Sequence, residues 1–347
     1  MPRVKHFLIG SALLFGVIGG FSLVKNRKAP VATPQAPQVV EIALSPPKPV
    51  EMRLPAPKIT PQPVVIAPPP PQPKVAEMEE IVEVDRISQL FSLDSSKLPI
   101  VETLSYTSRV PWLKGRPAWI ADYATHYETS RHFIARSLNS KGKKPMTANG
   151  QVGPDYFSQK VSPGDRFNVL RKDLNVQFHL LIDLSRCRMW LYYLDLTSNE
   201  RMLLKTYRVG LGRIDEMKAS GYLTPAGKYQ LGEKIAIYKP GTLGIFQDNK
   251  VEMIRVFGTR WIPFEKEVEG CTESAKGFGI HGAPWVADAS GQLVEDLGKI
   301  GTYDSDGCIR LSSADMEEIF AIIITKPTTV ELVKDFRQAK LPGVERK

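Results

Sequence analysis

Cysteine is scarce in this chain, with three residues among 347. So few cannot form the disulfide framework of a small secreted domain, and an odd count leaves at least one thiol unpaired. The length allows two domains, and 42% apolar residues are enough for a sizeable core. The unpaired thiol is therefore a candidate for chemistry rather than for cross-linking.

Net positive charge is also small outside the amino-terminal region. The net charge is +9, but residues 1–75 carry nine Lys or Arg and two acidic residues, which leaves +2 for the other 272. A nearly neutral folded part lacks the basic face of a nucleic-acid-binding domain. The sequence therefore predicts no nucleic-acid partner.

An apolar run of eighteen uncharged residues, 7–24, is long enough to span a bilayer. A cleaved signal peptide is the competing interpretation, but the run exceeds the usual length of its apolar segment and no small-x-small triplet follows it. A buried core helix is disfavoured because no amphipathic sequence surrounds the run. We predict a retained signal anchor over 1–28. Basic residues flank the apolar run on both sides, so the charges do not decide its orientation in the membrane.

Proline dominates the next segment, since residues 30–73 contain fifteen of the 28 prolines. Such a sequence favours extended polyproline II, which rises about 3.1 Å per residue, so the segment could reach roughly 100 Å. We interpret 29–75 as a linker that acts as a spacer, in preference to a ligand for a proline-binding module.

Two stretches with apolar residues at helical spacing follow, 77–92 and 117–138. They predict a small helical region over 76–150, followed by a loop-rich connector over 151–175. From Phe178 the pattern changes to short alternating strands bounded by turn residues, which is typical of an antiparallel or mixed sandwich or barrel. The predicted fold class is therefore mainly β.

A helix and a last strand close this β-rich part. Ser312 and Asp315 resemble a capping box that opens a helix over 314–325, and 328–333 reads as a strand.

Two segments carry the residues that indicate chemistry, one around His281 and one around Cys308. A thiol becomes a strong nucleophile when a nearby imidazole takes its proton. The amides near Gly307 and Cys308 could stabilise an oxyanion, Arg310 offers a cation for a substrate carboxylate, and Ser305 adds a hydroxyl beside the nucleophile. Each residue alone has an ordinary structural explanation, but their crowding favours an active site.

The other cysteines and histidines suggest no metal centre. His126 and His132 lie six positions apart and so do not share one helix face. A zinc site made of Cys271, His281 and Cys308 lacks a closely spaced ligand pair and is disfavoured. No metal or cofactor is predicted.

Cys187 and Cys271 receive structural interpretations. Cys187 lies in an apolar strand pattern, which favours inert packing. Cys271 lies in a Gly-rich loop, where it is exposed, paired with Cys187 or without a role.

The motifs resemble the catalytic domain of the L,D-transpeptidases, the YkuD-like family. The family's His-Gly and Ser-x-Gly-Cys-[Ile/Val]-Arg signature appears as His281-Gly282 and as the seven residues 305–311 (SDGCIRL). The segments 209–212 (VGLG) and 224–227 (TPAG) and the helix-opening Asp315 also fit the family pattern. The resemblance covers residues 176–335 and implies an L,D-transpeptidase-like β-sandwich with a short helix after the cysteine motif.

This resemblance implies acyl transfer on peptidoglycan stem peptides without a cofactor. Cys308 would attack the carbonyl of the third stem residue, a diamino acid such as meso-diaminopimelate, and expel the terminal D-Ala. His281 would move the protons, oriented by the carbonyl of Gly282. Arg310 would bind the peptide, and Ser305 would support the cysteine loop.

Two departures from the family pattern stand out. Asp306 places an acid beside the nucleophile, which would raise its pKa or alter substrate preference. The 23 residues between His281 and Ser305 are longer than the commonest form and predict an enlarged loop that could cover the substrate.

The substrate of this family lies outside the cytoplasmic membrane, which suggests a single-pass membrane protein with its catalytic domain in the periplasm or cell-wall space. The expected partners are stem peptides, the membrane through the anchor, and cell-wall or division proteins through the linker or helical region. The predicted organisation is anchor 1–28, linker 29–75, helical region 76–150, connector 151–175, catalytic domain 176–335 and tail 336–347.

Other functions remain open at this stage. The same acyl-enzyme could be hydrolysed, which would make an L,D-carboxypeptidase, or could attach a protein to the wall. A membrane-tethered protein that binds the wall without catalysis is the alternative from another class. A papain-like protease is a weaker candidate, because His281 precedes Cys308 in the sequence.

Overall fold

The computed structural model describes residues 83–107, 110–139 and 159–346. These residues all fall in one compact unit that begins at Val75. The predicted anchor and linker lie outside the described residues. Within the described part of the chain, no helix is long and apolar enough to cross a membrane.

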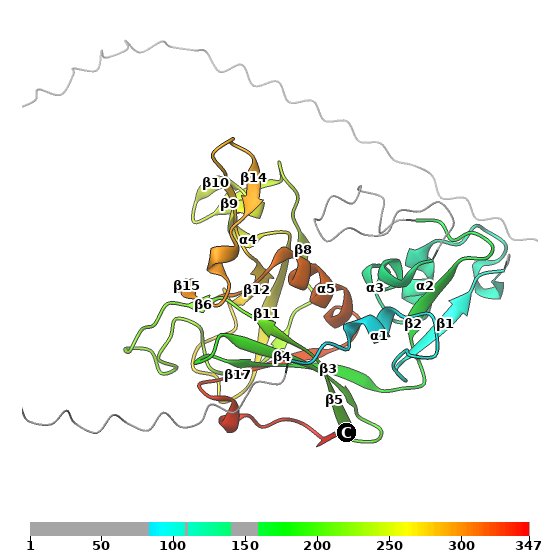
Figure 1. The fold of residues 1–347 in the computed structure, drawn as a ribbon, viewed down its shortest axis with the longest axis horizontal. Coiled ribbons are helices and arrows are strands. Elements are labelled where there is room, and N and C mark those ends of the chain that lie inside the picture. Colours follow the sequence, from blue (N-terminus) through cyan, green and yellow to red (C-terminus); the bar gives the residue numbers. More distant parts are fainter. Residues whose placement is uncertain (1–82, 108–109, 140–158, 347) are drawn as a thin grey trace, which may run out of the picture. The chain divides into compact units, whose positions relative to one another are not determined.

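The described chain is mainly β with a few short helices, which confirms that part of the predicted fold class (Figure 1). The helices are α1 (Ile87–Phe91), α2 (Ile120–His126), α3 (Arg131–Ser137), α4 (Ile254–Phe257) and α5 (Ser313–Ile323), with 3₁₀ turns η1 (Pro111–Leu113), η3 (Leu297–Lys299) and η4 (Phe336–Gln338). The strands are β1 (Val101–Ser105), β2 (Arg166–Leu170), β3 (Val176–Asp183), β4 (Arg188–Asp195), β5 (Glu200–Arg208), β6 (Leu211–Gly212), β7 (Gly227–Leu231), β8 (Ala236–Ile237), β9 (Leu243–Phe246), β10 (Asn249–Glu252), β11 (Arg260–Glu269), β12 (Gly279–Gly282), β13 (Trp285–Ala287), β14 (Leu293–Glu295), β15 (Tyr303–Ser305), β16 (Ile309–Leu311), β17 (Thr328–Val333) and β18 (Val344–Glu345).

One mixed sheet of ten strands organises the β-rich part. Its order is β16-β12-β11-β7-β17-β3-β4-β5-β18, with β8 paired to β11. The pairs β12–β16, β17–β3 and β5–β18 are parallel, and the other pairs are antiparallel. Because β16 and β12 form one end of this order, the two sequence segments singled out for chemistry become neighbouring strands.

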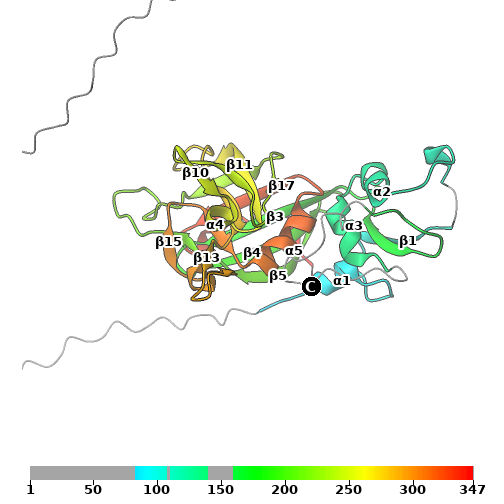
Figure 2. The same ribbon diagram turned by 90° about the horizontal axis from the view of Figure 1, so that it is seen from above.

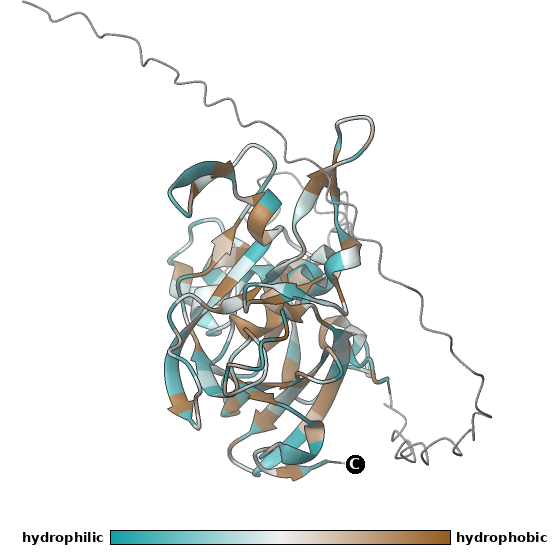
Figure 3. Cartoon of the chain, turned by 90° about the vertical axis from the view of Figure 1, so that its left-hand side faces the viewer, coloured by the Kyte–Doolittle hydropathy of each residue, from teal (hydrophilic) through white to brown (hydrophobic). Residues whose placement is uncertain are grey.

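The central strands β3 and β4 are buried on both faces, which explains their nearly continuous apolar sequences. On one face, α5 shares the main core with inward side chains of the strands, among them Leu180, Ile182, Met316, Ile319 and Phe320 (Figure 2). On the other face, the carboxyl-terminal segment covers a small cluster made of Leu181, Trp190, Tyr192, Phe336 and Leu341. Apolar and polar segments are interleaved along the strands in Figure 3.

The predicted capping box and last strand are confirmed. Ser312 Oγ accepts a hydrogen bond from the amide of Asp315 at 3.1 Å and lies 2.7 Å from its carboxylate, at the start of α5. The predicted strand over 328–333 is β17.

The prediction of one helix over 117–138 is wrong, because the segment forms two helices. Glu128 has φ of 50° between α2 and α3, a left-handed conformation that ends a helix. Ser130 then caps α3 by accepting a hydrogen bond from the amide of Phe133. The region also contains the antiparallel pair β1–β2, so it is mixed α and β rather than helical.

A helix was predicted over 77–92. Of the residues 83–92 that the structure describes, only α1 is helical. Residues just before α1 are extended along β5: Thr206 donates to the carbonyl of Val84 at 3.1 Å, and Arg86 donates to that of Leu204 at 2.7 Å. These residues are extended because they hydrogen-bond to β5, and the helical spacing of apolar residues in the sequence does not indicate such contacts.

Candidate active site

The parallel pair β12–β16 brings the two candidate segments together. His281 is the Cα partner of Arg310, and Ile280 is the partner of Ile309. Ile280 and Ile309 are fully buried in the main core, so the alternation of side chains directs His281 and Arg310 to the opposite face. Cys308 directly precedes β16 and shares the face of Arg310. Residues 27 positions apart in sequence therefore meet on one side of two adjacent strands.

The sulfur of Cys308 lies over β12. Its thiol donates a hydrogen bond to the carbonyl of Gly277 with an Sγ to oxygen distance of 3.7 Å, and the backbone of Gly279 hydrogen-bonds to the sulfur. Gly279 is two positions before His281 on the same strand. Between these two described residues, Cys308 and His281, no hydrogen bond is formed, so proton transfer requires the thiol to turn from Gly277 towards the ring.

His281 is buried and held by backbone and aromatic groups. Its Nδ1 lies 2.8 Å from the carbonyl oxygen of Gly282, the contact that the family resemblance implied. With Nδ1–H donated to Gly282, the lone pair for base catalysis lies on Nε2; the backbone of Phe257 also hydrogen-bonds to the ring. The ring packs edge-to-face on Phe257 with centroids 5.3 Å apart, and lies 5.7 Å from the ring of Trp261. Phe257 and Trp261 were not identified from the sequence. The aromatic residues in 257–264, ahead of His281 in the chain, could have suggested them.

Burial keeps both reacting groups neutral. It lowers the pKa of His281 to about 4, and the positive charge of Arg310 adds to this effect. Burial also raises the pKa of Cys308 to about 11, with a smaller contribution from Asp306, as predicted. The neutral imidazole can accept a proton at ordinary pH, whereas the thiol stays protonated until attack begins.

The cysteine loop is shaped by Ser305 and Gly307. Ser305 Oγ donates to the carbonyl of Cys308 at 2.7 Å and accepts from the amide of Gly307 at 3.1 Å. Gly307 has φ of 122°, and a Cβ there would lie 2.5 Å from the ring of Phe278, so only glycine fits. The sequence predicted that the amides of Gly307 and Cys308 stabilise an oxyanion. The Gly307 amide already donates its hydrogen bond to Ser305, so the Cys308 amide is the remaining candidate.

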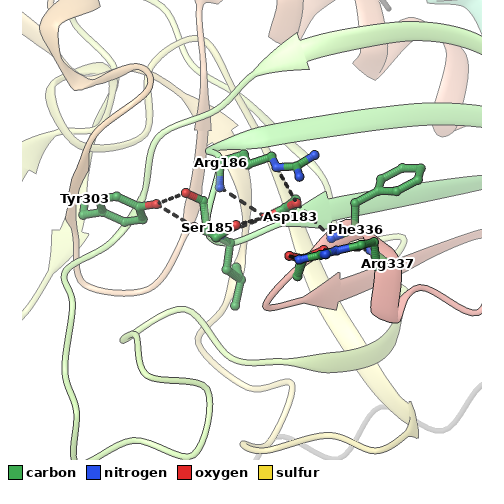
Figure 4. Close-up of polar contacts among 8 residues, drawn as sticks. Asp183, Ser185, Arg186, Tyr303, Phe336 and Arg337 are labelled. Carbon is green, nitrogen blue, oxygen red and sulfur yellow. Dashed lines mark hydrogen bonds and ion pairs between the residues drawn. The ribbon is translucent and has the colours of Figure 1, made fainter. Parts of the chain in front are cut away.

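A polar network anchors the strand that leads into this loop (Figure 4). The hydroxyl of Tyr303 in β15 lies 2.8 Å from the carbonyl of Leu184 and 2.9 Å from that of Ser185. Asp183, fully buried, accepts from the amides of Ser185 and Phe336. The cysteine loop is thereby tied to the β3–β4 turn and to the carboxyl-terminal segment, a link that the sequence did not reveal.

Arg310 is mostly buried and partly neutralised. Its Nη1 lies 3.1 Å from Asp304 Oδ2, which also binds Lys299 Nζ at 2.8 Å. Its Nε is buried and makes no hydrogen bond to any described residue, so this donor is unsatisfied. Neither Asp304 nor Lys299 was identified from the sequence.

All three cysteines are free. Cys187 is buried, but it lies in the turn between β3 and β4 with φ of 50° rather than in a strand, which corrects the prediction. Cys271 is half-buried with its sulfur 3.0 Å from the carbonyl of Lys228, and does not pair with Cys187. Across the described residues, no group of three or more His, Cys, Asp or Glu could hold a metal ion.

The long stretch after His281 forms a hairpin, β13–β14, followed by η3. The indole nitrogen of Trp285 lies 3.3 Å from Ser313 Oγ at the start of α5, which fastens the hairpin to the helix after the cysteine motif.

No curated protein matches this chain. Among solved structures, the helical cell shape determining protein Pgp2 from Campylobacter jejuni is 17% identical with a TM-score of 0.32, covering 49% of this chain and 51% of that one. Bd1075 from Bdellovibrio bacteriovorus is 15% identical with a TM-score of 0.31, covering 46% and 48%. The chain spans about half the length of these proteins. Residues 177–332 match the model of the YkuD family, the L,D-transpeptidase catalytic domain, which confirms the resemblance that the sequence motifs predicted.

Proposed function

We propose that this protein is a peptidoglycan L,D-transpeptidase that uses Cys308 as its nucleophile. The observation that carries the proposal is that Cys308, directly before β16, contacts the backbone of Gly279 on the adjacent strand β12, two positions before His281. The match of residues 177–332 to the L,D-transpeptidase catalytic domain supports the reaction class.

The first half-reaction forms a thioester. As the sulfur of Cys308 attacks the carbonyl carbon of the third stem residue, its proton passes to Nε2 of His281. The amide of Cys308 faces the developing oxyanion. When the intermediate collapses, His281 returns the proton to the nitrogen of the departing D-Ala, and the peptide stays bound to sulfur.

The second half-reaction transfers the peptide to the side-chain amine of a neighbouring stem. The amine attacks the thioester carbon, its proton passes to His281, and the released sulfur of Cys308 is protonated again.

We further propose that the catalytic domain works outside the cytoplasmic membrane, carried on the predicted linker and anchored through residues 1–28. The eighteen-residue apolar run and the proline-rich segment support this arrangement. Fusion of a reporter enzyme active only outside the cytoplasm to the carboxyl terminus tests the orientation, and an inactive external reporter beside an active cytoplasmic one would reject it.

Product analysis of the purified full chain with disaccharide tetrapeptides tests the function. We expect cross-linked dimers together with free D-Ala, and neither product from Cys308→Ala. Tripeptides and D-Ala without dimers would instead assign hydrolysis. Absence of D-Ala release by the native protein would overturn the proposal.

A further inference from the structure

A cavity of about 480 Å³ lies where the region before the family match meets the β-rich part. Glu128, from the turn between α2 and α3, forms one wall. Residues 172–177, which lead from β2 into β3, form a second wall, and residues 325–327, between α5 and β17, form a third. Three segments that are far apart in the sequence therefore build one cavity.

This cavity is separate from the candidate active site. Helix α5 begins at Ser313, five positions after Cys308, and ends at Ile323, two positions before the wall residue Thr325. A helix of 11 residues is about 16 Å long. The cavity and the cysteine loop thus lie at opposite ends of α5, and none of the residues that line the cavity belongs to the reacting groups.

The charges in the cavity wall cancel. Two lysines, Lys172 and Lys326, are matched by two acids, Glu128 and Asp173. Lys326 pairs with Glu128 at 3.9 Å, and Asp173 pairs with Arg171, which is not part of the lining. A wall without net charge favours a neutral ligand over a phosphate or a polyamine.

Neutral hydrogen-bonding groups are free in the same wall. Asn175 is exposed and Gln177 is half-buried. Neither side-chain amide hydrogen-bonds to any residue that the structure describes. Each amide can donate and accept at once, and Leu174 and Pro327 add apolar surface beside them. The lining therefore suits a neutral ligand that has both donors and acceptors and a small apolar group.

Contacts within the chain hold the cavity wall in place. The carbonyl of Asn175 accepts a hydrogen bond from the amide of Leu196 at 3.0 Å. The carbonyl of Pro327 accepts one from the amide of Phe178 at 3.1 Å. Because these bonds order the backbone before a ligand arrives, less entropy is lost on binding.

We propose that this cavity binds an acetamido sugar of a polysaccharide and so holds the enzyme on a glycan at a distance from Cys308. The ring of such a sugar supplies hydroxyl groups for the free side-chain amides and for the ammonium of Lys172. Its acetamido group supplies a carbonyl and an N–H for the amides, and a methyl group for the apolar surface of Leu174 and Pro327. The site goes beyond the proposed function, because it recognises a sugar rather than a peptide and uses no nucleophile.

Ligand-observed NMR with the full chain carrying Cys308→Ala tests this site. The probe is the β-1,4-linked tetramer of N-acetylglucosamine, which carries no peptide. We expect saturation transfer from the protein to the sugar, strongest at the acetamido methyl protons. The β-1,4-linked glucose tetramer, which lacks the acetamido groups, should bind about fivefold more weakly, as the loss of one hydrogen bond allows. Absence of transfer to the acetamido tetramer, or equal affinity for the two tetramers, would overturn the inference.

Substitutions in the cavity wall locate the sugar. Asn175→Ala and Gln177→Ala should each weaken binding of the acetamido tetramer about fivefold, because each removes one free amide. Gln230→Ala is the matched control, since Gln230 on β7 is also half-buried but does not line this cavity. It should leave the affinity within about twofold of the parent value. Undiminished binding in both cavity variants would reject this cavity as the site.

A separate measurement of thioester formation by the native protein distinguishes the two proposals. Thioester formation without sugar binding would reject the glycan site and keep the transfer reaction. Sugar binding without any thioester would reject the reaction and keep the site.

Discussion

His281 and Arg310 are Cα partners across β12 and β16, so a fixed positive charge lies beside the proposed base. That charge helps to hold the pKa of His281 at about 4, after the larger effect of burial. A substrate carboxylate bound to Arg310 would cancel part of the charge and make the imidazole more basic. Binding of a substrate carboxylate by Arg310 would therefore raise the basicity of His281, its partner in the strand register.

Arg310→Ala should reduce kcat/KM for the tetrapeptide about 100-fold, because the remaining site lacks a cation for the peptide. Its effect on thermal melting should be smaller, since the side chain lies outside the main core. Arg213→Ala is the control: Arg213 pairs with Asp306 at 2.6 Å, but both side chains are exposed, so little activity should be lost. Parallel losses of activity and of melting temperature in Arg310→Ala would indicate a structural role instead.

The pH dependence of Cys308 alkylation should reveal a neutral resting pair. With the thiol pKa raised to about 11, the rate with iodoacetamide should rise about tenfold per pH unit from neutrality towards pH 11. A plateau near pH 6 to 7 would indicate a preformed thiolate–imidazolium pair and contradict this account.

The acylation rate should follow His281. Its lowered pKa means that the neutral, base-competent ring persists down to about pH 4, so kcat/KM should fall only as the pH drops through that value. A fall centred near pH 6.5, the ordinary value for histidine, would show that burial does not control this ring.

Gly258→Ala should disturb His281 through Gly282, whose carbonyl oxygen contacts the imidazole. Gly258 has φ of 61°, and a Cβ there would lie 2.6 Å from the carbonyl carbon of Gly282. We expect the free energy of unfolding to fall by about 2–4 kcal/mol. The acylation rate of the folded variant should also fall, and by more than in the control variant below. Gly241→Ala is matched, because its φ is also positive at 85° but no atom lies within 4 Å of the added Cβ. Equal behaviour of the two variants would show that the contact with Gly282 is unimportant.

Cys187→Ala should affect stability more than catalysis. Cys187 is buried in the β3–β4 turn, and its removal leaves a small void, which should lower the free energy of unfolding by about 1 kcal/mol. Chemical denaturation and thioester formation measure the two effects separately. Loss of the thioester in a variant that remains folded would refute the assignment of Cys187 to packing.

The sequence predicted best the features that depend on neighbours in the chain. The capping box at Ser312 is confirmed, whereas the catalytic roles assigned to the residues of the cysteine motif stay predictions. The helix over 117–138 was mispredicted because a left-handed residue interrupts an otherwise regular apolar pattern. Phe257, Trp261 and the β-strand edge that receives Val84 depend on long-range packing and register, which apolar spacing does not encode.

Intact-protein mass spectrometry after brief exposure to a tetrapeptide tests the nucleophile most directly. The account predicts an added mass equal to the peptide without D-Ala, mapped to Cys308 by digestion and absent from Cys308→Ala. An adduct that persists in Cys308→Ala, or none on the native protein while the peptide is demonstrably bound, would contradict it.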